Sequence, residues 1–228
     1  MLCIGHRGAM GHEPENTLLS VRKALTLGVD AIEIDVYNVE NNLVVIHDRD
    51  LSRTTNGTGY IEERSFAYLR SLDAGKGEQI PTLAEVIETV NRQAIVNIEL
   101  KGSNTAKLVV ELIQTYLKQG WAYQDFVVSS FNHYELRQVK PICDQIKTGM
   151  LIYGLPWEYL ATAQKLQADI VISSLDFVTC ELIDSVHQHN LLVWVYTVNQ
   201  PHDIERLKAL QVDAIFTNYP ERIISNYN

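Results

Sequence analysis

The chain has 228 residues, of which 28 are acidic and 19 are basic, and its net charge is −9. This length fits one large α/β domain or two small ones, and the mixed composition excludes the disordered and fibrous classes. The acidic balance argues against a general affinity for nucleic acid or for anionic membranes.

The first residues, MLCIGHRG, lack the basic start and the apolar run of a signal peptide. No stretch approaches the roughly eighteen uninterrupted apolar residues of a membrane span. We therefore expect a cytoplasmic protein that acts on a small molecule, without stable membrane association.

Short β-branched runs alternate with helix-like segments along the whole length, which predicts a parallel sheet with crossover helices. We expect eight strands, at 2–6, 30–36, 94–100, 126–131, 148–153, 169–174, 191–198 and 213–217. Helices are predicted within 14–28, 82–92, 105–120, 132–140, 158–166, 179–189 and 203–210, and PERIIS at 220–225 closes the chain. Eight β/α units in one domain predict an α/β fold of the (β/α)8 TIM-barrel type, although the length alone would also suit a doubly wound sheet.

One further β-like run, LVVIHD at 43–48, follows the second strand after only a few residues. A parallel crossover needs about a dozen residues, so we expect a hairpin here. A turn at Asn41-Asn42 would set His47 beside Val36 and Asp35. Residues 49–80 are polar and rich in Gly and Thr, and we interpret them as a small insertion near the site, within a single domain spanning 1–228.

The second strand contains AIEIDV at 31–36, with the carboxylates of Glu33 and Asp35 on one face. Taken alone, these six residues favour an antiparallel strand with one wet face. The third strand repeats the split, because NIELK places Asn97, Glu99 and Lys101 on one face. Since the connecting segments read as crossover helices, the pattern favours acids that point into a barrel mouth, where βα loops build active sites.

Three carboxylates in one barrel mouth, Glu33, Asp35 and Glu99, repel each other unless some are protonated or a cation joins them. Oxygen ligands alone suit a hard ion, Mg²⁺ or Ca²⁺, better than zinc. We expect one such divalent ion. Together with Arg7 and Lys101, it would give the site a slight positive charge that suits a phosphodiester.

Two histidines, His6 and His47, are expected to flank this cluster from opposite sides. Imidazole is the side chain best suited to give and take protons near neutral pH. A lone histidine is more often a satisfied polar residue, but two that converge on three carboxylates predict catalysis.

We expect five further residues to have supporting or packing roles. Glu15 and Asn16 lie at a helix start near the barrel mouth, and we expect them to support the site rather than to react. The three tryptophans, Trp121, Trp157 and Trp194, are expected to be packing residues.

The short motifs together resemble the glycerophosphodiester phosphodiesterase family in their order and spacing. They are HRG at 6–8, PENT at 14–17, ExD at 33–35, HD at 47–48 and ExK at 99–101, joined by PTLAEV at 81–86. The resemblance spans nearly the whole chain and implies a (β/α)8 barrel with a small insertion after the HD motif. It also implies a metal at Glu33, Asp35 and Glu99, acid–base work at His6 and His47, and phosphate contacts from Arg7 and Lys101.

Two positions depart from the family's pattern. The family usually shows WTVN where this chain has YTVN with Tyr196, and the late TDxP motif appears here as TNYP with Asn218. We expect neither to touch the catalytic core. They bear instead on the alcohol pocket, where Tyr196 and Phe131 would pack on the substrate.

The resemblance implies metal-dependent hydrolysis of glycerophosphodiesters, such as glycerophosphocholine or glycerophosphoethanolamine, to glycerol 3-phosphate and an alcohol. Which histidine is the acid, and whether a cyclic phosphate forms first, stays open.

Two other functions are kept as alternatives. A phospholipase D-like enzyme or cyclising lyase that acts on a lipid would need an exposed apolar rim near the site. The insertion supplies only a modest one, with Tyr60, Phe66, Tyr68 and Leu69. A non-enzymatic phosphodiester-binding module would be favoured by loss of either histidine, and both are present.

Overall fold

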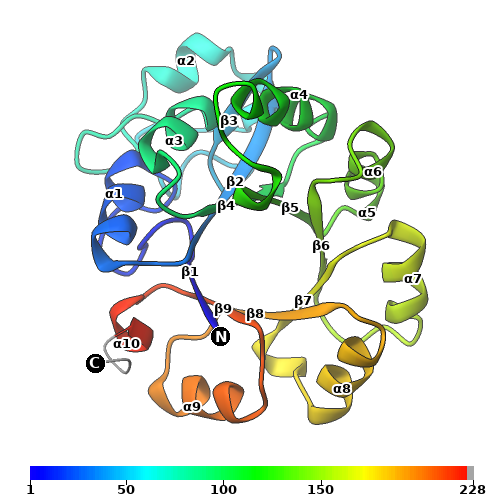
Figure 1. Ribbon diagram of the computed structural model, residues 1–228. Coiled ribbons are helices and arrows are strands. Elements are labelled where there is room, and N and C mark those ends of the chain that lie inside the picture. The colour runs from blue at the N-terminus through cyan, green and yellow to red at the C-terminus, as the bar shows by residue number, and fades with distance from the viewer. Residues whose placement is uncertain (225–228) are drawn as a thin grey trace.

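Eight parallel strands close into a barrel in the computed structural model, which describes residues 1–224 (Figure 1). Strand β1 pairs with both β2 and β9, and these two pairings close the ring. The prediction of a (β/α)8 TIM barrel is confirmed, and the doubly wound sheet is excluded. The barrel strands are β1 (Leu2–Gly5), β2 (Ala31–Val39), β4 (Ile95–Leu100), β5 (Phe126–Ser130), β6 (Lys147–Ile152), β7 (Ile170–Ser174), β8 (Leu192–Tyr196) and β9 (Ala214–Thr217).

Helices surround the ring on its outside (Figure 1). They are α1 (Leu18–Leu27), α3 (Leu83–Val90), α4 (Ala106–Leu117), α5 (His133–Leu136), α6 (Val139–Ile142), α7 (Tyr159–Leu166), α8 (Cys180–Gln188), α9 (Pro201–Ala209) and α10 (Glu221–Ile224). Within residues 1–224, none of the helices has the length and apolar character needed to span a bilayer.

The single helix predicted within 132–140 is wrong, because the structure has two short helices there, α5 and α6. Pro141 explains the break, since it has no N–H to donate to the carbonyl of Arg137, as a continuous helix would require. By contrast, α1 begins and ends close to the positions that the sequence predicts. The Thr17 hydroxyl accepts the N–H of Ser20, and Gly28 ends the helix at φ 83°, a left-handed conformation that glycine adopts without strain.

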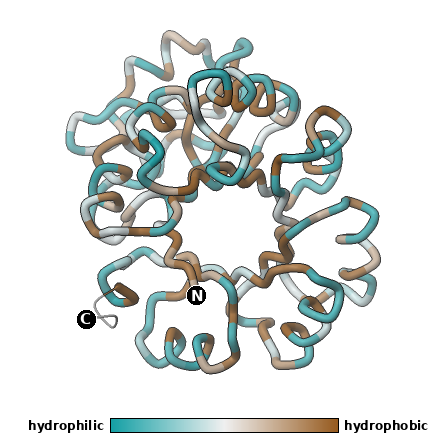
Figure 2. Tube along the Cα trace, in the orientation of Figure 1, coloured by the Kyte–Doolittle hydropathy of each residue, from teal (hydrophilic) through white to brown (hydrophobic). Residues whose placement is uncertain are grey.

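Apolar side chains form one layer inside the strand ring and a larger one between the ring and the helices. Brown, hydrophobic segments are frequent along the strands of the ring (Figure 2). The inner layer consists of Ile4, Ala31, Val127, Leu151, Ile170, Ile172, Trp194, Ala214 and Phe216. Trp121 and Trp194 are buried as predicted, but Trp157 is 98% exposed. The packing role expected for Trp157 is wrong, because it lies in the exposed segment 155–158 between β6 and α7.

Strand β2 returns antiparallel as β3 (Asn42–Val45), so the predicted hairpin is present, but its register differs. Val36 pairs with Val45 and not with His47. The turn lies at Glu40 and Asn41, whose φ angles are 53° and 63°. Two successive left-handed residues are typical of a type I′ turn, which matches the twist of a two-residue hairpin. The expected turn at Asn41-Asn42 was wrong because a glutamate gives no local sign of a left-handed backbone.

The insertion packs on this hairpin and shares an apolar cluster with it. It contains a short 3₁₀ helix (Ile61–Glu63) and α2 (Phe66–Arg70). The cluster joins Leu51, Ile61, Leu69, Leu72, Ala74 and Ile80 of the insertion with Tyr37, Val39, Val44 and Ile46 of the hairpin and its end. The backbone N–H of Ile46 also bonds to the carbonyl of Asp35 at 3.0 Å. The segment that leads to His47 is therefore fixed from two sides.

Replacing Ile61 by alanine is expected to lower the free energy of unfolding by about 2–5 kcal/mol, because the change leaves a cavity in a packed core. Ile61 is fully buried in the shared cluster. Urea denaturation followed by circular dichroism measures this loss. The control Ile142→Ala removes a side chain that is 42% exposed on α6, and should change stability by only about 0.5 kcal/mol. Equal losses in the two variants would contradict the shared core.

Candidate active site

A pocket of about 230 Å³ opens at the carboxyl end of the barrel strands. This is the end at which TIM barrels carry their sites. Most of the predicted site residues line it: the lining consists of His6, Arg7, Glu33, His47, Glu99, Phe131, Leu151, Tyr196, Thr197 and Phe216. Asp35 and Lys101 lie directly beside it, since Lys101 Nζ is 3.9 Å from Asp35 Oδ1 and 3.2 Å from Glu99 Oε1.

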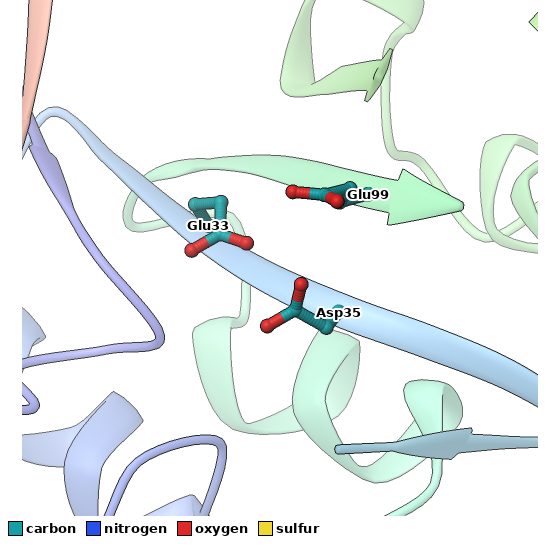
Figure 3. Close-up of side chains that lie close together, drawn as sticks. All are labelled: Glu33, Asp35 and Glu99. Carbon is teal, nitrogen blue, oxygen red and sulfur yellow. The ribbon is translucent and has the colours of Figure 1, made fainter. Parts of the chain in front are cut away.

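The three predicted acids converge (Figure 3). Glu33 and Asp35 project from β2, and Glu99 projects from the neighbouring strand β4, where it pairs with Asp35. One carboxylate oxygen from each lies within 4.8 Å of the other two, and all three residues are buried. The inward direction follows from the sequence, because Ile32, Ile34 and Ile98 take the alternate positions and fill the layer between barrel and helices.

Hydrogen bonds hold one oxygen of Glu33 and one of Asp35, whereas two other oxygens of the cluster have only the ion-pair contacts with Lys101. Glu33 Oε2 accepts the N–H of Arg7 at 2.9 Å, and Asp35 Oδ2 accepts from Asn16 Nδ2 at 2.9 Å. Asp35 Oδ1 and Glu99 Oε1 are buried and accept no hydrogen bond. Asn16 thus lies in the supporting position that we expected.

Burial raises the pKa of Glu33 well above its ordinary value, and the charges of Asp35 and Glu99 raise it further. Burial also raises the pKa of Glu99, with Asp35 as the next cause. A site that carries this repulsion must hold protons or a cation. Free carboxylate oxygens that face one another, with no histidine or cysteine in the cluster, fit a hard divalent ion such as Mg²⁺ or Ca²⁺.

His6 follows β1 and takes Asn218 as its hydrogen-bond partner. His6 Nδ1 is 2.8 Å from Asn218 Oδ1, so Nδ1 donates and Nε2 keeps its lone pair. His6 Nε2 is 4.0 Å from Glu33 Oε2. Burial lowers the pKa of His6 to about 4, and the charge of Arg7 adds to this effect. The expectation that Asn218 does not touch the catalytic core was wrong. Asn218 directly follows β9, and β9 pairs with β1 where the barrel closes, so Asn218 lies beside His6.

His47 has a carboxylate partner instead. Its Nδ1 is 2.6 Å from Asp48 Oδ1, and its Nε2 is 3.1 Å from Lys101 Nζ. The Asp48 carboxylate and the Lys101 ammonium group therefore contact opposite nitrogens of the ring. Despite the changed register of the hairpin, the structure brings His47 into the lining of the same pocket as His6.

An arginine of the insertion, to which the sequence gave no role, connects these elements. Arg53 bonds to Asp48 and, through both terminal nitrogens, to Glu15 at 2.7 Å. Glu15 also accepts from Arg7 Nη1 at 2.6 Å. An arginine in a Thr-rich loop carries no local signal of such contacts, which join residues far apart in the chain.

The remaining wall of the pocket is apolar. Tyr196 donates its hydroxyl hydrogen to the carbonyl oxygen of Ile152 at 2.9 Å, and Phe131 meets the Tyr196 ring edge-on, with 5.6 Å between ring centroids. Leu151 and Phe216 complete this wall. The pocket therefore combines a charged part with an apolar part.

Comparisons with known proteins agree with these features. Residues 6–222 match the model of the glycerophosphoryl diester phosphodiesterase family. A glycerophosphodiester phosphodiesterase from Caldanaerobacter subterraneus is 35% identical, with 98% of this chain and 96% of the relative covered. One from Bacillus subtilis is 30% identical, with 97% and 84% covered.

The fold agrees as well. The solved structure of an Oleispira antarctica phosphodiesterase, in complex with the product sn-glycerol-3-phosphate, matches with a TM-score of 0.91. It is 31% identical, and the match covers 100% of this chain and 96% of that one. The resemblance read from the motifs is confirmed, and the chain belongs to the glycerophosphoryl diester phosphodiesterase family of phosphoric diester hydrolases.

Proposed function

We propose that the chain hydrolyses glycerophosphodiesters, such as glycerophosphocholine or glycerophosphoethanolamine, to glycerol 3-phosphate and an alcohol. The observation that carries this proposal is the convergence of three buried carboxylates on one pocket that also holds two histidines and an arginine. Membership of the family supports the reaction class. The product bound in the Oleispira phosphodiesterase supports glycerol 3-phosphate as the anionic product.

Glu33, Asp35 and Glu99 would hold one divalent ion, Mg²⁺ or Ca²⁺. When bound, such an ion would offset the repulsion among the carboxylates and stabilise negative charge on the phosphoryl oxygens. Arg7 and Lys101 would contact the same phosphate. Arg7 Nε is buried without a hydrogen-bond partner and lies 3.6 Å from Asp35 Oδ2, so it can serve an incoming anion.

The two histidines would divide the proton transfers. His6, neutral and with Nε2 free toward the pocket, suits the general base that takes a proton from the attacking hydroxyl group or water. His47, with Asp48 behind it, suits the general acid that protonates the leaving alcohol. The phosphate would draw Lys101 Nζ away from His47 Nε2 and leave that nitrogen able to carry the proton.

The apolar wall would take the carbon skeleton of the substrate. Phe131 and Tyr196 line the same pocket as the charged groups, and their rings meet edge-on. A phosphodiester held by Arg7 and Lys101 would therefore pack one of its alcohol groups on these rings.

The proposal is tested by offering glycerophosphocholine with Mg²⁺, with Ca²⁺ or with EDTA, and measuring release of glycerol 3-phosphate. EDTA and the variant Glu99→Gln are both expected to abolish turnover, because each removes the ion or one of its ligands. Glu88→Gln is the control, since Glu88 lies on α3 and contacts Tyr116. Full activity in EDTA would remove the ion from the reaction.

The substitution His47→Ala is expected to lower kcat by about 10²–10⁴, the contribution of one positioned acid or base. Its circular dichroism spectrum should match that of the parent chain. His202→Ala changes a histidine whose side chain is 79% exposed on α9, and should leave kcat unaltered. If His47→Ala turned over substrate at the parental rate, His47 would have no part in catalysis.

The variant Asn218→Asp tests which histidine is the base. A carboxylate on Nδ1 stabilises the imidazolium, so the pKa of His6 should rise from about 4. A base works only when unprotonated, so the acidic limb of the kcat/KM profile should move to higher pH, by about one unit or more.

Asn190→Asp adds the same charge at an exposed position and should not move that limb. A shift confined to the basic limb in Asn218→Asp would instead make His6 the acid.

A further inference from the structure

Exposed apolar side chains gather at the mouth of the pocket. Within residues 1–224, eight large apolar residues are well exposed, and five of them lie within 131–134 and 153–157, the segments directly after β5 and β6. These five are Phe131, Tyr134, Tyr153, Leu155 and Trp157. Tyr153 is 71% exposed and Trp157 is 98% exposed. Such a concentration in two neighbouring loops, on the face that carries the site, needs an explanation beyond packing.

The exposed residues continue the apolar wall of the pocket. Phe131 lines the pocket and contacts Tyr196, which bonds to the carbonyl of Ile152, directly before Tyr153. Tyr153 in turn meets Phe177 edge-on at 5.4 Å. We define the aromatic rim as Phe131, Tyr153, Leu155, Trp157 and Phe177. It begins inside the pocket and runs outward over the ends of β5, β6 and β7.

The charges on the loops after β6 and β7 indicate what the outer part of the rim can contact. The segments YGLPWE at 153–158 and LDFVT at 175–179 contain Glu158 and Asp176 and no lysine or arginine. Both acids are exposed. Such a surface repels anionic lipids but suits the ammonium ends of zwitterionic head groups, through carboxylates and through aromatic faces. Tryptophan and tyrosine also favour the boundary between water and lipid, since each has an apolar ring and a polar atom.

We propose that the aromatic rim docks reversibly on a zwitterionic lipid–water interface of the phosphocholine type. Docking turns the mouth of the pocket toward the surface where phosphodiester head groups lie. The loop tip at Leu155 and Trp157 enters the head-group region, and the barrel stays in water. The rim thus lies on the loops after β5, β6 and β7 and not on the insertion, where the sequence showed only a modest apolar surface.

Tryptophan fluorescence tests the docking directly. Trp121 and Trp194 are buried, so a change in emission on adding lipid reports on Trp157. With phosphatidylcholine vesicles, the emission should shift to shorter wavelength and be quenched by brominated acyl chains. Trp157→Phe should lose the shift and still sediment with the vesicles, because the apolar ring is kept. These measurements are made in EDTA without substrate, so their outcome is independent of the proposed reaction.

A second variant measures the contribution of the loop tip. The double change Leu155→Ala and Trp157→Ala should weaken co-sedimentation with phosphatidylcholine vesicles by about tenfold or more, because each buried apolar side chain contributes to partitioning. Hydrolysis of soluble glycerophosphocholine should be unchanged, which also shows that the variant folds. Ile142→Ala, equally apolar and 42% exposed on α6, should bind vesicles like the parent chain.

Three results would overturn the proposal. One is an emission spectrum that does not respond to phosphatidylcholine. Another is stronger binding to phosphatidylglycerol vesicles, which would make the contact one of general charge. The third is a dimer without lipid, seen by sedimentation velocity and lost in the double variant, which would make the rim a contact between two copies of the chain.

Discussion

The cost of burying three carboxylates in one barrel mouth governs the arrangement of the polar residues around them. Glu33, Asp35 and Glu99 cannot all ionise together without compensation, because burial and mutual repulsion both disfavour the charged forms. The chain compensates partly with Arg7 and Lys101, whose nitrogens approach the acids at 3.2–3.9 Å. Asp35 Oδ1 and Glu99 Oε1 accept no hydrogen bond, so the compensation is incomplete without a proton or a cation. The residues that would bind the phosphate are therefore the same ones that make the acid cluster tolerable.

A second network of hydrogen bonds connects the insertion to the site. Arg53 bonds to Glu15, which holds Arg7, and to Asp48, which holds His47. Arg53 is kept in place by a loop whose apolar residues share a core with the hairpin. The insertion is thus more than a surface loop, since its Arg53 contacts both carboxylates that hold Arg7 and His47. Such indirect support is a common reason why groups beyond the reacting atoms matter for catalysis.

Repeating local patterns made much of the fold and the acid cluster predictable. The alternation in AIEIDV and NIELK fixes which side chains face inward, and the parallel pairing of Asp35 with Glu99 follows once both strands lie side by side. The errors arose where distant residues or backbone angles decide. Glu40 has a left-handed backbone conformation, which a glutamate in the sequence does not predict. Trp157 lies in an exposed loop, although a tryptophan in the sequence suggests packing. The contact between His6 and Asn218 spans 212 positions, so only the closed barrel reveals it.

That contact also separates two residues that look equivalent in the sequence. His6 and His47 are both histidines at the mouth of one pocket, but a neutral amide oxygen holds the first and a carboxylate holds the second. The amide oxygen of Asn218 orients the ring of His6 and brings no net charge, whereas the carboxylate of Asp48 orients the ring of His47 and brings a negative charge. Burial beside Arg7 moves His6 further toward its neutral form, and a bound cation would push it in the same direction. The two rings in this pocket therefore differ in their hydrogen-bond partners, and in the proposed reaction His6 would accept a proton and His47 would donate one, as an in-line displacement at phosphorus requires.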